Sequence, residues 1–205
     1  MKVIGLSGGI GSGKSTVAQF LGEMGAVVVG LDKVGHEALK PGGEAWERII
    51  SEFGKDILTV SGEIDRAKLA GLVFNNRELL ARLTRIVHPV IDNMVNAKIE
   101  EYRRQGTQVV VLEAAAILEA GRASQVDELW VTVAPETKII QRLTERAGYS
   151  EEESRSRINS QMPSEERIGQ ADVVIDTDCT LDELKARVLV EWRKLQARLS
   201  GRLTD

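Results

Sequence analysis

Nine residues near the amino terminus have the types and the spacing that bind a phosphate chain. They contain the pattern Gly-x-x-x-x-Gly-Lys-Ser, from Gly8 to Ser15. Glycines let the backbone pass close to phosphates, and successive N–H groups can then form an anion-binding nest. Lys14 can reach the β- and γ-phosphates and the Ser15 hydroxyl can ligate Mg²⁺, whereas a plain strand-to-helix turn is the alternative. The residues expected to bind the nucleotide are Gly8, Gly9, Ile10, Gly11, Ser12, Gly13, Lys14, Ser15 and Thr16.

Two acidic residues come just after short apolar runs. Glu113 follows Val109–Leu112, and Asp32 follows Ala26–Val29. In a parallel sheet such strand ends lie on the same side as the phosphate loop. Glu113 could therefore hold Mg²⁺ through water, with a solvated strand end as the alternative. Asp32 could accept a proton from a hydroxyl group, or it could be the N-cap of the helical pattern that follows it.

Two arginines form a second charged group. Arg142 and Arg146 are four residues apart, so they share one face of a helix. They could clamp phosphates, or they could simply keep the surface soluble. Further along, Glu151 and Arg155 have the spacing of an ion pair on a solvated helix face, and a mobile lid is the functional alternative.

The elements that must position these residues alternate between strands and helices. Five short apolar runs, mostly of β-branched residues, are typical of strands buried on both faces. Longer helical patterns lie between and after them, and Thr180 with Glu183 has the spacing of a capping box. This alternation predicts an α/β sheet covered by helices on both sides. The runs are Val3–Leu6, Ala26–Val29, Val109–Leu112, Leu129–Val133 and Val173–Ile175, and the helical patterns are Lys14–Met24, a stretch that starts near Pro135, and Thr180–Leu199.

Two segments do not fit the alternation. Residues 33–107 are helical in pattern, are broken by glycines, and contain Pro89, which we expect to kink or end a helix. Residues 148–170 are polar and precede the last strand. We expect a single domain over 1–205, with a nucleotide-binding core of 1–32 and 108–205. Residues 33–107 would then bind an acceptor, and 148–170 would form a lid.

Composition narrows the classes of function. The 205 residues carry 27 Lys and Arg against 31 Asp and Glu, for a net charge of −4, which argues against a nucleic-acid coat. One Cys and two His leave little for a disulfide framework or a His-based metal cage. No apolar run is long enough for a membrane span and no secretion signal is visible, so we expect a cytoplasmic protein. The short chain, the helical insertion and the lack of an Asn-Lys-x-Asp segment favour a small-molecule kinase over a GTPase.

Several segments together resemble the dephospho-coenzyme A kinase family, in order and over essentially the whole chain. The combination of Ile64-Asp65-Arg66, His88-Pro89 and Gln161-Met162-Pro163 is the most specific part of this resemblance. The matching residues are Ser7–Ser15, Asp32 with His36, Pro41-Gly42, Phe53-Gly54, Ile57-Leu58, Gly62–Arg66, Leu69, Val73-Phe74, His88-Pro89, Glu119–Gly121, Arg142-Leu143, Arg146, Ser150, Arg157-Ile158, Gln161–Pro163 and Ala171–Asp176.

The resemblance implies a three-layer P-loop kinase fold with a five-stranded parallel sheet, and transfer of phosphate from ATP, with Mg²⁺, to the ribose 3′-hydroxyl of dephospho-coenzyme A. It implies that Asp32 is the general base, and that Lys14 and Arg142 stabilise the transferring phosphoryl group. It also implies that Arg146 binds nucleotide near the lid. The resemblance also implies that the acceptor is contacted by Asp32, Glu119 and two residues of the insertion, Arg66 and His88. His88 could equally be a packing and capping residue. We expect a monomer, with a small homo-oligomer left open.

The chain departs from the family pattern in three places. Gly30 stands where the family usually has an acid, the segment Glu113–Glu119 lacks the usual Pro and Phe, and Ala147 replaces an acid after Arg146. The altered segment near Glu113 leaves open another nucleoside or nucleotide kinase. The missing acid at Gly30 leaves open a nucleotide-binding module without transfer activity.

Overall fold

The computed structural model describes residues 1–74 and 76–201. The chain divides into two compact units. The first unit consists of residues 1–29 and 106–205, and the second unit of residues 30–105. Among the described residues, no helix is both long and apolar enough to cross a membrane.

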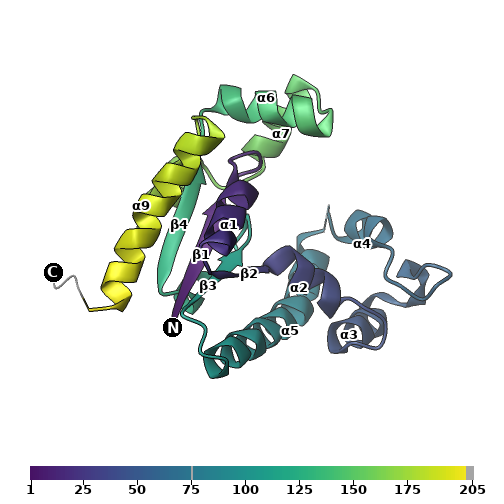
Figure 1. The fold of residues 1–205 in the computed structure, drawn as a ribbon. Helices are drawn as coiled ribbons and strands as arrows, with labels where there is room; N and C mark the ends of the chain where they lie inside the picture. Colours follow the sequence, from purple (N-terminus) through teal and green to yellow (C-terminus); the bar gives the residue numbers. More distant parts are fainter. Residues whose placement is uncertain (75, 202–205) are drawn as a thin grey trace. The chain divides into compact units, whose positions relative to one another are not determined.

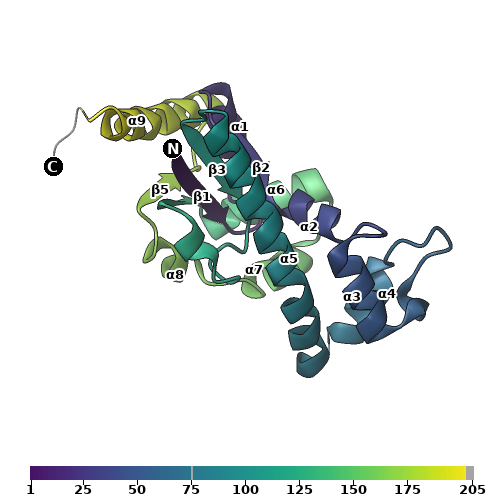
Figure 2. The same ribbon diagram turned by 90° about the horizontal axis from the view of Figure 1, so that it is seen from below.

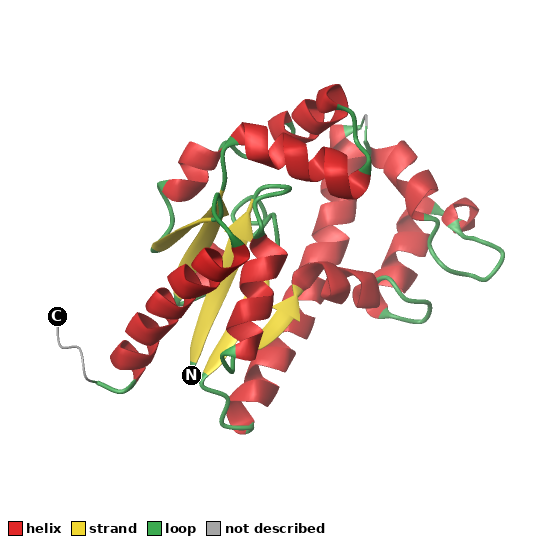
Figure 3. Cartoon of the chain, turned by 45° about the horizontal axis from the view of Figure 1, so that its top comes forward, coloured by secondary structure: helices red, strands yellow, loops and turns green. Residues whose placement is uncertain are grey.

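A five-stranded parallel sheet is the centre of the fold, with strand order β2-β3-β1-β4-β5. Its strands coincide with the five apolar runs, which confirms the predicted fold class. Strand β1 pairs on one side with β3, where Val3 lies opposite Val110, and on the other with β4, where Leu6 lies opposite Trp130. Figure 3 shows these strands side by side. Their bounds are Lys2–Gly8 for β1, Val27–Gly30 for β2, Val109–Glu113 for β3, Glu128–Val133 for β4 and Val173–Asp176 for β5.

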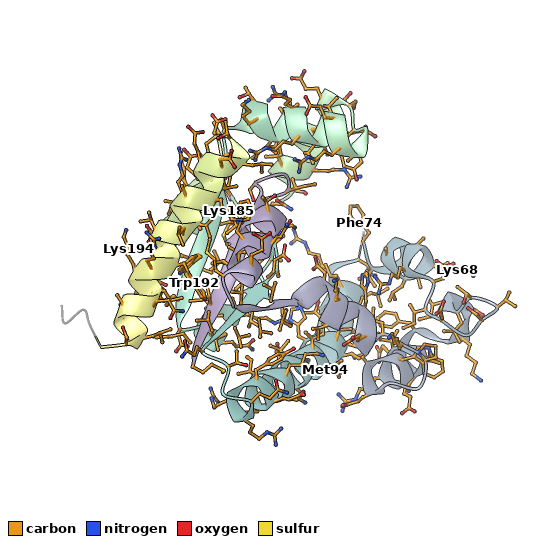
Figure 4. All side chains as sticks on the ribbon, in the orientation of Figure 1. Lys68, Phe74, Met94, Lys185, Trp192 and Lys194 are labelled. Carbon is orange, nitrogen blue, oxygen red and sulfur yellow. The ribbon has the colours of Figure 1, made fainter. Side chains whose placement is uncertain are left out.

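Two helices of the first unit cover one face of the sheet. Helix α1 (Lys14–Glu23) and helix α9 (Leu181–Leu199) lie side by side there, and both views of the ribbon agree (Figures 1 and 2). The buried core forms between them and the strands. On α9, Trp192 points toward the sheet whereas Lys194 points away from it (Figure 4). The core side chains from these elements include Leu6, Val17, Leu21, Val111, Trp130, Ile175, Leu184, Val188 and Leu195.

The capping box predicted at the start of α9 is present. The Thr180 hydroxyl accepts from the Glu183 N–H, and the Glu183 carboxylate accepts from the Thr180 N–H at 2.9 Å. A second capping box, of Ser150 and Glu153, begins α7. The remaining helices of the first unit are η2 (Arg122–Gln125), α6 (Glu136–Ala147), α7 (Glu151–Asn159) and α8 (Ser164–Ile168). Helices α6 and α7 lie beyond the carboxyl ends of the strands (Figure 1).

The second unit is helical, as the pattern of 33–107 indicates. Glycine-containing turns separate the elements from α2 to α4, with Gly54 directly after α3 and Gly62 between η1 and α4. Its own core contains Ile49, Ile57 and Leu69. The elements are α2 (Leu31–Ala38), α3 (Glu44–Phe53), η1 (Lys55–Ile57), α4 (Arg66–Val73) and α5 (Arg77–Arg104).

Of the two effects expected of Pro89, a kink or an end of the helix, the end is wrong. Helix α5 continues through Pro89 to Arg104. Proline removes only one intrahelical hydrogen bond, and the exposed ring of Pro89 meets solvent rather than a neighbouring element. On the following turns Val90, Ile91 and Val95 are buried, so tertiary packing holds the helix across the interruption.

Candidate active site

The phosphate loop connects β1 to α1 and depends on glycine, as Gly8 and Gly13 show. At Gly8 a Cβ atom would lie 2.1 Å from the Thr132 hydroxyl oxygen and 2.6 Å from that of Ser12, so no side chain fits. Gly13, the N-cap of α1, has a φ of 84°, a left-handed conformation that side chains disfavour. The sequence motif therefore corresponds to real steric requirements of the backbone.

The start of α1 presents unpaired N–H groups. Within the described part of the chain, no hydrogen bond uses the backbone N–H groups of Gly13, Lys14 and Ser15. The first N–H groups of a helix have no intrahelical acceptor, and they carry the positive end of the helix dipole. This is the arrangement that binds a phosphate group.

Lys14, Ser15 and Glu113 form a charged cluster at the loop. The Ser15 hydroxyl donates to Oε1 of Glu113 at 2.8 Å, and Nζ of Lys14 lies 3.5 Å from the same oxygen. The side chains of Lys14 and Glu113 are 16% and 20% exposed, so their attraction is only partly screened by water. Strand β3 brings Glu113 here because it pairs directly with β1.

Two oxygen donors of this cluster fit a magnesium ion. Mg²⁺ is bound in proteins through one or two oxygen ligands while phosphates and water complete its shell. Because the Ser15 hydroxyl hydrogen points at Glu113, its lone pairs are free for a cation. Glu113 supplies a compensating charge that could act through water. Among the described residues no group of three acidic, His or Cys side chains could hold a metal without such outside ligands.

A cleft of about 340 Å³ adjoins the loop and is lined by Gly9–Thr16, Arg142, Arg146 and Gln161, among others. Arg142 comes from α6 and is half-buried. Its Nη1 donates to the carbonyl oxygen of Gly11 at 3.1 Å and to the hydroxyl of Thr177 at 2.9 Å. Arg146 is exposed one turn further along the same helix. The structure thus brings both arginines to the loop, and Arg142 is tied to the loop backbone rather than lying free on the surface.

Glu119 lies in the segment after β3 and pairs with Arg167, whose side chain is 3% exposed. The distance between Nη2 of Arg167 and Oε1 of Glu119 is 2.6 Å. Partial burial alone would raise the pKa of Glu119, but the hydrogen bond and the charge of Arg167, with backbone N–H donors, hold that pKa below its ordinary value of 4.5. Glu119 is therefore ionised at neutral pH, and it anchors a buried cation beside the phosphate loop.

Sequence reasoning gave no role to three groups around the loop. Gln161, between α7 and α8, accepts from the N–H of Ile10 at 2.8 Å. Arg167 lies close to Gly9, where a Cβ atom would come within 3.2 Å of its Nη1. Thr177, directly after β5, contacts both Arg142 and the loop. Position at the carboxyl end of a parallel strand was the one signal that could have indicated Thr177.

The other predicted site residues belong to the second unit. Asp32 is exposed in the first turn of α2, Arg66 begins α4, and His88 is half-buried within α5. The alternative that Asp32 is an N-cap is wrong, because the N-cap of α2 is Gly30. The functional roles of Asp32, Arg66 and His88 stay predictions.

Segment 151–159 contains the ion pair expected of a solvated helix face, and its action as a lid stays a prediction. It forms α7, where Arg155 and Glu151 make an ion pair at 2.9 Å with both side chains more than half exposed. Arg157 stacks on the ring of Tyr149, 4.1 Å from its centre.

Comparison with known proteins agrees with this geometry. A family model described as dephospho-CoA kinase matches residues 2–183. Over 194 residues, 95% of this chain, the sequence is 42% identical to the dephospho-CoA kinase of Carboxydothermus hydrogenoformans, of which it covers 94%. It is 40% identical to that of Geobacter sulfurreducens, covering 95% of this chain and 98% of that protein. The solved structure of the dephospho-CoA kinase from Campylobacter jejuni has the same fold, with a TM-score of 0.72, 24% identity and 98% of each chain covered. Since the family model spans most of the chain and includes the phosphate loop, this chain belongs to the dephospho-CoA kinase family.

Proposed function

We propose that this chain transfers the γ-phosphoryl group of ATP to the ribose 3′-hydroxyl of dephospho-CoA, giving CoA and ADP, the last step of CoA synthesis. The observation that carries the proposal is the cluster of Lys14, Ser15 and Glu113 at the mouth of a loop with unpaired N–H groups. Family membership supports the acceptor, and the loop supports the donor.

The loop and its cations account for binding of the donor. The free N–H groups of Gly13, Lys14 and Ser15 would bind phosphate oxygens. The ammonium group of Lys14 would interact with the terminal phosphates, partly in place of its ion pair with Glu113. Arg142 and Arg146 would add positive charge from the α6 side of the cleft. Such fixed donors stabilise charge that develops on the phosphoryl oxygens during transfer.

We propose Ser15 and Glu113 as the residues that hold Mg²⁺. The ion would neutralise negative charge on the phosphates when it is bound. The contribution of this chain is the orientation of the Ser15 hydroxyl, which Glu113 fixes by accepting its hydrogen at 2.8 Å.

We propose Asp32 as the general base. Its carboxylate would take the proton of the 3′-hydroxyl while that oxygen bonds to the γ-phosphorus, and the bond from phosphorus to the β,γ-bridging oxygen breaks to release ADP. The carboxylate is exposed and does not cap its helix, so it is available for this role. Because position 30 is Gly, Asp32 is the acid after β2 that can accept the proton.

Residues of the acceptor site complete the proposal. Arg66 and His88 of the helical insertion, residues 33–107, and Glu119 would contact dephospho-CoA. The segment 148–170 would act as a lid that excludes water, because a kinase without such closure loses ATP to hydrolysis.

The test is product formation by the purified protein. With ATP, Mg²⁺ and dephospho-CoA it is expected to release ADP and CoA in equal amounts, measured by chromatography. A panel of other nucleosides and nucleotides serves as the control for acceptor choice. Preference for another acceptor, or ATP binding without transfer to any acceptor, would refute the proposal.

A further inference from the structure

The hydroxyl of Thr177 lies at the centre of a buried hydrogen-bond group beneath the phosphate loop. Thr177 is 1% exposed, directly after β5. Its Oγ1 receives a hydrogen bond from Nη1 of Arg142 at 2.9 Å. The same oxygen lies 2.9 Å from the carbonyl oxygen of Ser12 and 3.1 Å from that of Val133. One small side chain thus touches the loop, the end of β4 and an arginine of the cleft.

The hydroxyl has a single hydrogen, so it donates to one of the two carbonyl groups. Val133 already accepts from the backbone N–H of Thr177 at 2.8 Å. The Ser12 carbonyl is nearer to the hydroxyl, and among the described hydrogen bonds it has no other donor. The Thr177 hydroxyl therefore donates its hydrogen to the Ser12 carbonyl.

This bond fixes the direction of the next N–H group. In a trans peptide the C=O and the following N–H point in opposite directions. All described peptide bonds are trans. Because the Ser12 carbonyl points at Thr177, the Gly13 N–H points away from it, toward the cleft that Gly13 lines. Without the hydroxyl, the Ser12 carbonyl loses the hydrogen bond that is described for it.

Thr177 also holds Arg142. Besides the bond to the hydroxyl, Nη2 of Arg142 donates to the backbone carbonyl of Thr177 at 2.6 Å, and Nη1 donates to the Gly11 carbonyl at 3.1 Å. These bonds use three of the five guanidinium hydrogens and fix the plane of the group. The remaining hydrogens are available to a ligand in the cleft.

We propose that Thr177 is a positioning residue for the donor nucleotide, acting through the Gly13 N–H and through Arg142; the proposal rests on the function inferred above. A misplaced donor typically costs on the order of 10²-fold in rate, so we expect Thr177→Val to lower kcat/KM for ATP about 10- to 100-fold. Thr177→Ser retains the hydroxyl and should stay within about 3-fold of wild type. The KM for dephospho-CoA should change less than about 2-fold in both variants.

Thr132→Val is the matched control. Thr132 is also buried, at 2% exposure, but its hydroxyl contacts the Ser12 side chain and the Ser7 carbonyl, not the carbonyl of Ser12 or Arg142. This variant removes the same group at the same depth but leaves the bonds of the Ser12 carbonyl and of Arg142 in place, so we expect a similar loss of thermal stability with a clearly smaller loss of kcat/KM for ATP than in Thr177→Val. Equal kinetic losses in the two valine variants would overturn the proposal.

A double-mutant cycle separates positioning from mere stability. If Thr177 acts through Arg142, the losses from Thr177→Val and Arg142→Lys will not multiply, whereas those from Thr132→Val and Arg142→Lys will. Losses that multiply in both cycles would overturn the Arg142 part of the proposal. Should Thr177→Val fail to fold, Thr177→Cys, with a weaker donor, must show an intermediate loss; wild-type kinetics would overturn the proposal.

Binding of ADP, measured by calorimetry without any acceptor, distinguishes this inference from the proposed function. Weaker ADP binding by Thr177→Val supports the role of Thr177 even if the wild-type protein does not phosphorylate dephospho-CoA. Unchanged ADP binding, with normal kcat/KM for ATP, would overturn the role of Thr177 while the kinase reaction stands. A wild-type protein that bound no ADP would overturn both.

Discussion

Replacing Lys14 by methionine tests the electrostatics of the site directly. Methionine keeps most of the length of the side chain and removes its charge. In the structure Nζ of Lys14 lies 3.5 Å from Oε1 of Glu113 and is 16% exposed. A phosphate oxygen at a similar distance from Nζ of Lys14 would interact with the same partly desolvated ammonium group.

The expected loss follows from that distance. Two unit charges 3.5 Å apart attract by roughly 5 kcal/mol at an effective dielectric constant of about 20. This is an upper limit, because Lys14 gives up part of its attraction to Glu113 when phosphate binds. Loss of one fixed donor to a transition state usually costs about 3–4 kcal/mol, or 10²–10³-fold. We expect Lys14→Met to lower kcat/KM for ATP by that factor.

The assay is ADP release coupled to dephospho-CoA, with kcat and both KM values measured separately. Lys185→Met is the control, because it removes the same charge outside the cleft. Lys185 lies on α9 (Figure 4) and also makes an ion pair, with Glu23 at 2.8 Å. The Lys185→Met variant should retain wild-type kinetics. If Lys14→Met kept more than about a third of kcat/KM, or matched Lys185→Met, the phosphate role of Lys14 would be refuted.

Three further predictions concern the base, the buried ion pair and the lid. Asp32→Asn should lower kcat by about 10²–10⁴-fold with ADP binding unchanged; near-normal turnover would remove Asp32 from the role of base. Because the folded-state pKa of Glu119 lies below 4.5, the stability it gives is fully present above that pH and is lost as the pH falls through the folded-state pKa. The difference in unfolding free energy between wild type and Glu119→Gln should therefore stay constant from neutral pH down to about 5 and shrink below 4.5; a constant difference down to pH 3 would contradict this. Amides of residues 150–161 should exchange hydrogen faster than those of β1 without ligand and slow down with ATP and dephospho-CoA; equal, ligand-independent protection would refute a lid.

The sheet and most helices can be predicted because their signals are local. Each strand is a short β-branched run, and the first turn of α9 contains its own cap in Thr180 and Glu183. Boundaries shift by only a residue or so, as at β2, where the run Ala26–Val29 becomes Val27–Gly30. Pro89 shows the limit of such signals, since buried neighbours from other helices keep α5 continuous where the local rule predicts a break.

The phosphate loop can be predicted for a similar reason. Its glycines, Lys14 and Ser15 are contiguous, and the strand before them is short and apolar. Placing Glu113 near the loop required one further assumption, that its strand runs parallel to the strand before the loop, and the structure adds that β3 pairs directly with β1. That assumption is sound for a chain in which strands and helices alternate, because their carboxyl ends then share one edge.

The hydrogen bonds that hold the loop from behind could not be predicted this way. Arg142 is separated by 131 residues from the Gly11 carbonyl that it binds, and Thr177 by 165 residues from the Ser12 carbonyl. A threonine after a strand fits many roles equally well, and its hydrogen-bond partners exist only once β4, β5 and α6 have packed. A sequence motif identifies the donors that face a ligand, whereas the carbonyl groups on the opposite side of the same peptides must also be satisfied. A chain could therefore keep every residue of the motif and still lose the orientation of its loop through one buried hydroxyl at position 177.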